Sequence, residues 1–220
     1  MAHKLQQPIL YLITGGETTP LTGPDSPEFK RILELVHAAA HTGIHLIQLR
    51  EKSLPARVLF ELAKQAAAIT RKTETRLVIN DRADIARSAL CDGVHLTTRS
   101  LSADIVRKAF GTDFLVGVSA HSLEEAREAR DAGADFAVFG PVFDTPSKRA
   151  YGPALGLQKL EAATRELSSF PLIAIGGITL DNAQHALRAG ASGIAAIRLF
   201  GEPGNLEEIV LKVKGQNRLR

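Results

Sequence analysis

Short apolar runs alternate with longer amphipathic stretches along most of the chain. The runs are rich in β-branched and large aliphatic residues, and they cover residues 9–14, 44–49, 76–80, 93–96, 114–120, 136–140, 172–177 and 193–197. Nearly continuous apolar sequence of this length is typical of parallel strands that helices cover. The pattern therefore predicts eight buried parallel strands.

The stretches between these runs have the periodicity of amphipathic helices, most clearly at residues 27–43, 123–133 and 180–190. Ser122 and Glu125 have the spacing of a capping box, and Thr179 or Asp181 is placed to cap the last of these helices. Eight strands that alternate with helices over 220 residues predict an α/β fold, a single-domain (β/α)8 TIM barrel. The alternative is a doubly wound open sheet. We expect one domain over residues 1–220, with a core at about 9–200 and then a C-terminal helix and a basic tail.

Composition narrows the class of protein. The net charge of +3 suits an anionic small molecule, and the absence of Trp and of a dense Lys/Arg run argues against a nucleic-acid surface. Cys91 is the single cysteine, so no intrachain disulfide can form. No apolar stretch has the length of a transmembrane helix or fits a signal peptide. We expect a soluble cytoplasmic protein without a membrane partner, and the oligomeric state stays open, a homo-oligomer included.

Polar residues follow the predicted strands, and in a TIM barrel the chemistry lies at the carboxyl ends of the strands. These ends carry Gln48, Arg50, Lys52, Asn80, Asp81, Arg82, Thr97, Thr98, Arg99, Ser100, Ser119, His121, Thr145, Ser147, Lys148, Gly176, Gly177 and Arg198. Barrel closure would bring them to one face, so we expect them to line one pocket.

The segment "AIGGIT" before a predicted helix resembles the phosphate site of many barrels. Glycine lets a phosphate approach main-chain N–H groups, and the helix N-terminus adds a favourable potential. A tight turn would explain the glycines equally well. Hydroxyl and cationic residues of the preceding loop, Thr145, Ser147 and Lys148, favour the phosphate site.

Several of these residues also allow purely structural roles. Glu51 could form a surface ion pair with a neighbouring cation, and Asn80 and Asp81 could turn the chain and cap the next helix. His95 lies inside a predicted strand, which favours a structural histidine. For His121, catalysis and loop hydrogen bonding are equally compatible with its position.

Taken together, the segments resemble the thiamine phosphate synthase family, whose sister branch contains thiazole tautomerases. "QLREK", "INDRADIA", "DGVHL", "GVSAHS", "GADFAVFGPVFDTPSK", "GPALGL" and "AIGGIT…AGASGIAAI" occur in family order from about Leu10 to Phe200. The resemblance implies a transferase of thiamine biosynthesis. It would join a hydroxymethylpyrimidine pyrophosphate to a thiazole phosphate and release pyrophosphate, with Mg²⁺ as cofactor.

The resemblance also implies a role for each candidate residue. Gln48 and Asn80 would orient the pyrimidine, and Asp81 would bind Mg²⁺. Pyrophosphate would contact Arg50, Lys52, Ser119 and Lys148. The thiazole phosphate would contact Thr145, Ser147 and Gly177, with Arg198 at the end of the eighth strand either pairing with the phosphate or blocking it.

The chain departs from the family pattern where the second metal ligand is expected. The family usually has an acid after the fourth strand, and this chain has Ser100. Mg²⁺ can rely on water and substrate phosphates, so one missing acid weakens the site without excluding it. The missing acid fits the metal-free tautomerase branch, in which His121 would move a proton, or a non-catalytic paralogue that binds a thiamine precursor.

Overall fold

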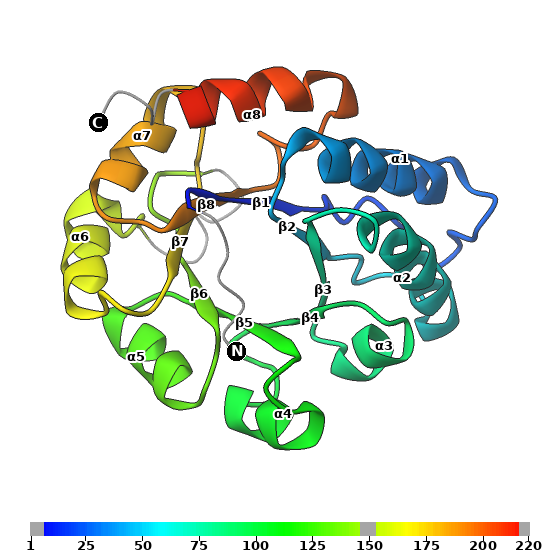
Figure 1. Cartoon of the computed structure of the whole chain (residues 1–220), viewed down its shortest axis with the longest axis horizontal. Coiled ribbons are helices and arrows are strands. Elements are labelled where there is room, and N and C mark those ends of the chain that lie inside the picture. Colours follow the sequence, from blue (N-terminus) through cyan, green and yellow to red (C-terminus); the bar gives the residue numbers. More distant parts are fainter. Residues whose placement is uncertain (1–6, 146–152, 216–220) are drawn as a thin grey trace.

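The computed structural model describes residues 7–145 and 153–215. Eight parallel strands close into a barrel in sequence order, which confirms the predicted fold class (Figure 1). The strands are β1 (Ile9–Ile13), β2 (Leu46–Leu49), β3 (Arg76–Asn80), β4 (Gly93–Leu96), β5 (Leu115–Ala120), β6 (Phe136–Phe139), β7 (Leu172–Ile175) and β8 (Gly193–Ala196). Several predicted runs extend one or two residues beyond the observed strand.

Helices form the outer ring around the barrel (Figure 1). They are α1 (Pro27–Thr42), α2 (Ala56–Thr70), α3 (Ala83–Ser88), α4 (Ala103–Phe110), α5 (Leu123–Asp131), α6 (Gly156–Glu166), α7 (Leu180–Arg188) and α8 (Leu206–Gly215), with a short 3₁₀ turn at η2 (Pro203–Asn205) before the last. Thr179 is the N-cap residue of α7, and its main-chain N–H donates to Asn182 Oδ1 at 2.8 Å. Asp181 lies inside the first turn instead of capping it.

The hydrophobic core has two parts, as barrel closure requires. The larger part fills the space between the outer face of the sheet and the helices. The smaller part fills the barrel interior and contains Ile9, Tyr11, Ile13, Leu46, Val78, Leu115, Phe136, Val138, Ile173 and Ala195. A Cβ atom at Gly117 would lie 2.3 Å from the Phe136 ring, so only glycine leaves room for this phenylalanine in the interior. In the part of the chain that the structure describes, no helix is long and apolar enough to cross a lipid bilayer.

Candidate active site

The carboxyl ends of the strands gather most of the predicted site residues on one face of the barrel. Gln48 and Asn80 are the buried polar residues of β2 and β3, and Ser119 lies half-buried near the end of β5. Arg50 is half-buried and Lys52 is exposed in the loop after β2. Ser147 and Lys148 lie outside the described residues, so their predicted roles stay predictions.

Buried side chains of the first three strands are joined by hydrogen bonds inside the barrel. The Tyr11 hydroxyl donates to Gln48 Oε1 at 3.1 Å, and Gln48 Nε2 donates to Asn80 Oδ1 at 2.9 Å. Asn80 Nδ2 then donates to Asp81 Oδ2 at 2.7 Å. The two amides that were predicted to orient a pyrimidine are therefore held by protein partners on both sides.

His95 on β4 connects the same tyrosine to Ser119. The Tyr11 hydroxyl lies 3.3 Å from His95 Nδ1, and His95 Nε2 lies 2.9 Å from Ser119 Oγ. Burial lowers the pKa of His95 to about 4, and burial likewise raises the pKa of Tyr11 well above its ordinary value. His95 is therefore a neutral, hydrogen-bonded histidine of the barrel interior. The position of His95 in the sequence favours a structural role, but its link to Ser119 is visible only in the structure.

Asp81 does not cap a helix, so that alternative is wrong. The N-cap position of α3 belongs to Arg82, and Asp84 pairs with the Arg82 guanidinium at 2.6 Å. The Asp81 carboxylate instead reaches the loop after β4, where its Oδ1 accepts from the Ser100 hydroxyl and from Thr97 Oγ1 at 3.3 Å. Its backbone is left-handed, with φ at 59°. Ser100 therefore stands beside Asp81, at the place where the family pattern has an acid.

Glu51 is a buried residue of the site that the sequence pattern does not indicate. The alternative of a surface ion pair is wrong, because only 3% of the Glu51 surface is exposed. Its carboxylate accepts from the Thr14 hydroxyl, from Thr18 Oγ1 at 2.8 Å and from the Gly16 main-chain N–H at 3.3 Å. Glu51 thus fixes the loop after β1 against the end of β2. Its signal in the sequence was weak, because its partners lie more than 30 residues away.

The opposite side of the barrel combines main chain at Gly177 with the side chains of Thr145 and Arg198. Gly177, after β7, has φ at 65°, and a Cβ atom there would lie 2.5 Å from the Asp144 carbonyl oxygen. This close approach requires glycine. Thr145 is buried in the neighbouring loop, and Arg198 Nη2 donates to its hydroxyl at 3.3 Å. Arg198 therefore reaches from the end of β8 to the loop that follows β6.

His121 lies at the end of β5, where 43% of its side chain is exposed. Glu125 Oε2 accepts from the His121 main-chain N–H at 2.6 Å and lies 3.2 Å from His121 Nδ1. Ser122 caps α5 by accepting from the Glu125 N–H, but the Glu125 carboxylate does not return to Ser122. The predicted capping box is therefore only half formed, because Glu125 binds His121.

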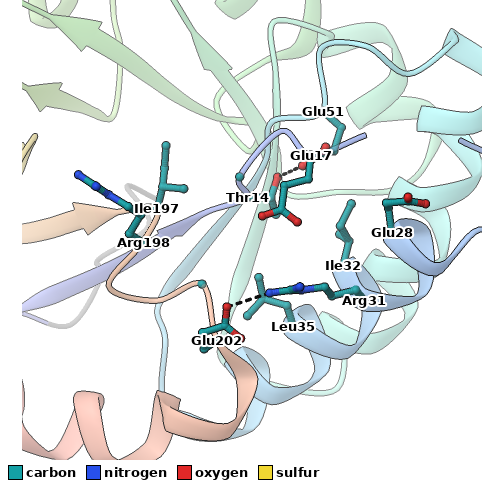
Figure 2. Close-up of a pocket in the computed structure, with 12 residues that line it drawn as sticks. Thr14, Glu17, Glu28, Arg31, Ile32, Leu35, Glu51, Ile197, Arg198 and Glu202 are labelled. Carbon is teal, nitrogen blue, oxygen red and sulfur yellow. Dashed lines mark hydrogen bonds and ion pairs between the residues drawn. The ribbon is translucent and has the colours of Figure 1, made fainter. Parts of the chain in front are cut away.

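A pocket of about 260 Å³ lies beside the barrel mouth, between the loop after β1, helix α1 and the loop after β8 (Figure 2). Glu51 and Thr14 form its inner edge and Arg198 lies at its other end, while an ion pair between Arg31 and Glu202 at 2.8 Å spans its outer edge. The pocket lining mixes acidic and basic side chains. The lining has no excess of basic side chains, so it does not favour the binding of a phosphate group in this pocket.

Comparison with known proteins shows the family of this chain. The family model described as thiamine monophosphate synthase matches residues 10–200. The chain belongs to this family. It is 38% identical over 197 residues to the thiamine-phosphate synthase of a Roseiflexus species, with 89% of this chain and 83% of the relative covered. It is 39% identical over 191 residues to the thiamine-phosphate synthase of Moorella thermoacetica, with 84% and 90% covered.

A solved structure gives the same result. Thiamine phosphate pyrophosphorylase from Pyrococcus furiosus superimposes with a TM-score of 0.78 at 29% identity, covering 96% of this chain and 97% of that one. The predicted family and barrel fold are therefore confirmed, and the synthase function and transferase class are confirmed as properties of the family. Mg²⁺ and the roles of individual residues stay predictions.

Proposed function

We propose that this chain joins a pyrimidine pyrophosphate to a thiazole phosphate in thiamine biosynthesis, with Gln48, Asn80, Asp81 and Ser119 on one side of the substrates. The observation that carries the proposal is the placement of these four residues at the carboxyl ends of β2, β3 and β5. Across the barrel lies the main-chain turn at Gly177, and the family model matches residues 10–200 of the chain.

The two sides of the site suit the two halves of the reaction. The bond between the pyrimidine methylene carbon and a pyrophosphate oxygen breaks, and the thiazole nitrogen forms the new bond to that carbon. Negative charge grows on the leaving pyrophosphate, so fixed cations and donors stabilise the transition state more than the ground state. Arg50 and Lys52 after β2 would supply this charge together with Lys148, and Gly177 and Thr145 would hold the thiazole phosphate.

The residues near Asp81 fit Mg²⁺ only as a site with few protein ligands. Among the described residues no group of three or more His, Cys, Asp or Glu side chains is placed to hold a metal ion. Asp81 offers one exposed carboxylate, and Ser100 and Thr97 offer hydroxyl oxygens beside it. Mg²⁺ is commonly held by one or two carboxylates together with substrate phosphates. Asp81 would hold the ion, which would neutralise charge on the pyrophosphate.

The test is pyrophosphate release from both substrates, measured with and without Mg²⁺. We expect release that depends on Mg²⁺ and on both substrates. The variant Asp81→Asn keeps the size of the side chain and tolerates the left-handed backbone, and it should lower turnover by about 10²–10³-fold.

Asp84→Asn is the matched control, because it removes an exposed carboxylate three residues away whose ion pair is with Arg82. Its turnover should match the wild type. Unchanged turnover in Asp81→Asn would show that the metal assignment is wrong. A wild-type protein that releases no pyrophosphate would contradict the synthase reaction itself.

A further inference from the structure

One continuous set of hydrogen bonds crosses the barrel interior from Asp81 to Ser119. We call it the interior network, and its members in order are Asp81, Asn80, Gln48, Tyr11, His95 and Ser119. All but one of the links join neighbouring strands or adjacent residues, and the link from Tyr11 on β1 to His95 on β4 crosses the barrel interior. Asp81 at one end is the candidate metal ligand, and Ser119 at the other end is a candidate substrate contact. The direction in which the hydrogen bonds of the network are donated therefore affects both residues.

The direction of the first bonds follows from the carboxylate. A carboxylate can only accept, so the Asn80 atom that lies 2.7 Å from Asp81 Oδ2 must be the NH₂ group. The Asn80 oxygen therefore faces Gln48, and the Gln48 atom 2.9 Å from it must be the NH₂ group. The Gln48 oxygen is left facing the Tyr11 hydroxyl at 3.1 Å, which has to donate.

The direction of the remaining bonds follows from the tyrosine. Its hydroxyl has one proton, which Gln48 already receives, so the bond of 3.3 Å to His95 must be donated by His95 Nδ1–H. A neutral imidazole carries only one proton, so Nε2 is the acceptor and Ser119 Oγ–H donates to it at 2.9 Å. The lowered pKa of His95, about 4, agrees with a neutral ring at physiological pH.

We infer that Tyr11 and His95 are positioning residues, and that the Asp81 carboxylate determines which ring nitrogen of His95 carries the proton. Tyr11 holds the Gln48 amide in one of its two orientations, and His95 holds the Ser119 hydroxyl. That Gln48 and Ser119 contact substrate rests on the proposed function. The orientation of the network does not, because it follows from the protein atoms alone.

The opposite direction of the network is excluded by the same carboxylate. If every bond were reversed, the Asn80 oxygen would face an Asp81 oxygen at 2.7 Å with no proton between them. The other Asp81 oxygen is already fixed as an acceptor. The Thr97 main-chain N–H donates to Ser100 Oγ at 2.7 Å, so the Ser100 proton is directed to Asp81 Oδ1. Asp81 thus receives donors on both sides.

The tautomer of His95 can be read directly by NMR. Two-bond ¹H–¹⁵N correlation spectra distinguish Nδ1–H from Nε2–H in a neutral imidazole, and the variant His95→Gln identifies the His95 signal among the seven histidines. We expect Nδ1–H in the wild-type protein without ligands. A His95 ring with its proton on Nε2 would overturn the inference.

Asp81→Asn tests the coupling over four hydrogen bonds. The new amide should keep its oxygen toward the Ser100 hydroxyl and turn its NH₂ group toward Asn80. Every amide in the network then has to turn over, Tyr11 donates to His95, and the His95 proton moves to Nε2. A His95 signal that stays Nδ1–H in Asp81→Asn would overturn the coupling, whatever that variant does to turnover.

Tyr11→Phe removes the hydroxyl that links Gln48 to His95 and keeps the aromatic ring packed in the barrel interior. His95 should lose its fixed tautomer and show both forms, and kcat/KM should fall by about tenfold because Gln48 is no longer held in one orientation. Ile173→Val is the matched control, since it changes a fully buried residue of the same interior cluster that lies outside the network. It should keep both the Nδ1–H signal and the wild-type kcat/KM. A tautomer that is unchanged in Tyr11→Phe would overturn the role of Tyr11.

Discussion

The two sides of the barrel mouth differ in the groups that they present to a ligand. On the side of β1 to β5, four buried polar side chains are joined to the exposed Asp81 and the half-buried Ser119 in the interior network. On the side of β6 to β8, the interior residues Phe136, Val138, Ile173 and Ala195 are apolar. The candidate phosphate site there is the main-chain turn at Gly176 and Gly177 beside the buried Thr145. Under the proposed function, the first side would recognise the pyrimidine through oriented side chains, and the second side would recognise the thiazole phosphate through main-chain N–H groups.

This difference follows from what each kind of ligand group requires. A planar heterocycle is recognised by donors and acceptors in a fixed order, which only oriented side chains provide. A phosphate offers acceptors in all directions, so several N–H groups and a helix N-terminus suffice. The polar side should therefore respond to pH and to the loss of single hydrogen bonds, and the main-chain side should respond mainly to added side-chain bulk.

Three predictions test this comparison. The largest expected effect is a pH dependence of the unfolding free energy that comes from His95. Its folded-state pKa of about 4 lies below the unfolded value of 6.5, so the unfolded chain binds the proton more readily. The contribution of His95 to the unfolding free energy is fully present above pH 6.5 and is lost as the pH falls. The loss is about 3 kcal/mol at pH 4.

Urea unfolding at pH 7 and pH 4 measures this contribution when wild type is compared with His95→Gln. Other titrating groups, including His45 with a pKa that is also lowered to about 4, stay the same in both proteins. The wild type should therefore lose about 3 kcal/mol more than the variant over this range. Equal losses would show that His95 is not a neutral buried residue.

The next effect concerns the main-chain side. Gly177→Ala forces a side chain onto a left-handed residue and brings its Cβ atom to 2.5 Å from the Asp144 carbonyl oxygen. We expect a loss of about 2 kcal/mol in unfolding free energy, measured by urea titration, and a raised KM for the thiazole phosphate with little change for the pyrimidine.

Gly204→Ala is the control for Gly177→Ala, because no atom lies within 4 Å of an added Cβ at that position. It should change stability by no more than about 0.5 kcal/mol. If both alanine variants behaved alike, the close approach at Gly177 would not be needed for the site.

The smallest effect is expected at His121. Its side chain is exposed and its described partner is Glu125. Neither residue belongs to the interior network. His121→Ala should change pyrophosphate release by less than about twofold, within the range typical of surface substitutions. A loss comparable to that of Asp81→Asn would assign His121 to the chemistry and would favour the proton transfer of the tautomerase branch.

The sequence by itself determined the order of elements and the identity of most candidate residues. Continuous apolar runs separated by amphipathic helices can bury both faces of a strand only in a helix-covered parallel sheet. The polar residues that follow those runs then have to meet at one end. Gln48, Asn80 and Ser119 were found in this way because their position along the strand is a local property.

Only the tertiary structure decided which side chains meet and what each one does there. Glu51 became a buried anchor for Thr14 and Thr18, and Asp81 turned to Ser100 instead of capping α3. Tyr11 and His95 came together across 84 residues. Barrel closure and strand register set these contacts, and the energetic cost of an unpaired buried polar group selects among them. Sequence pattern records whether a residue is polar or buried, but not which distant partner satisfies it.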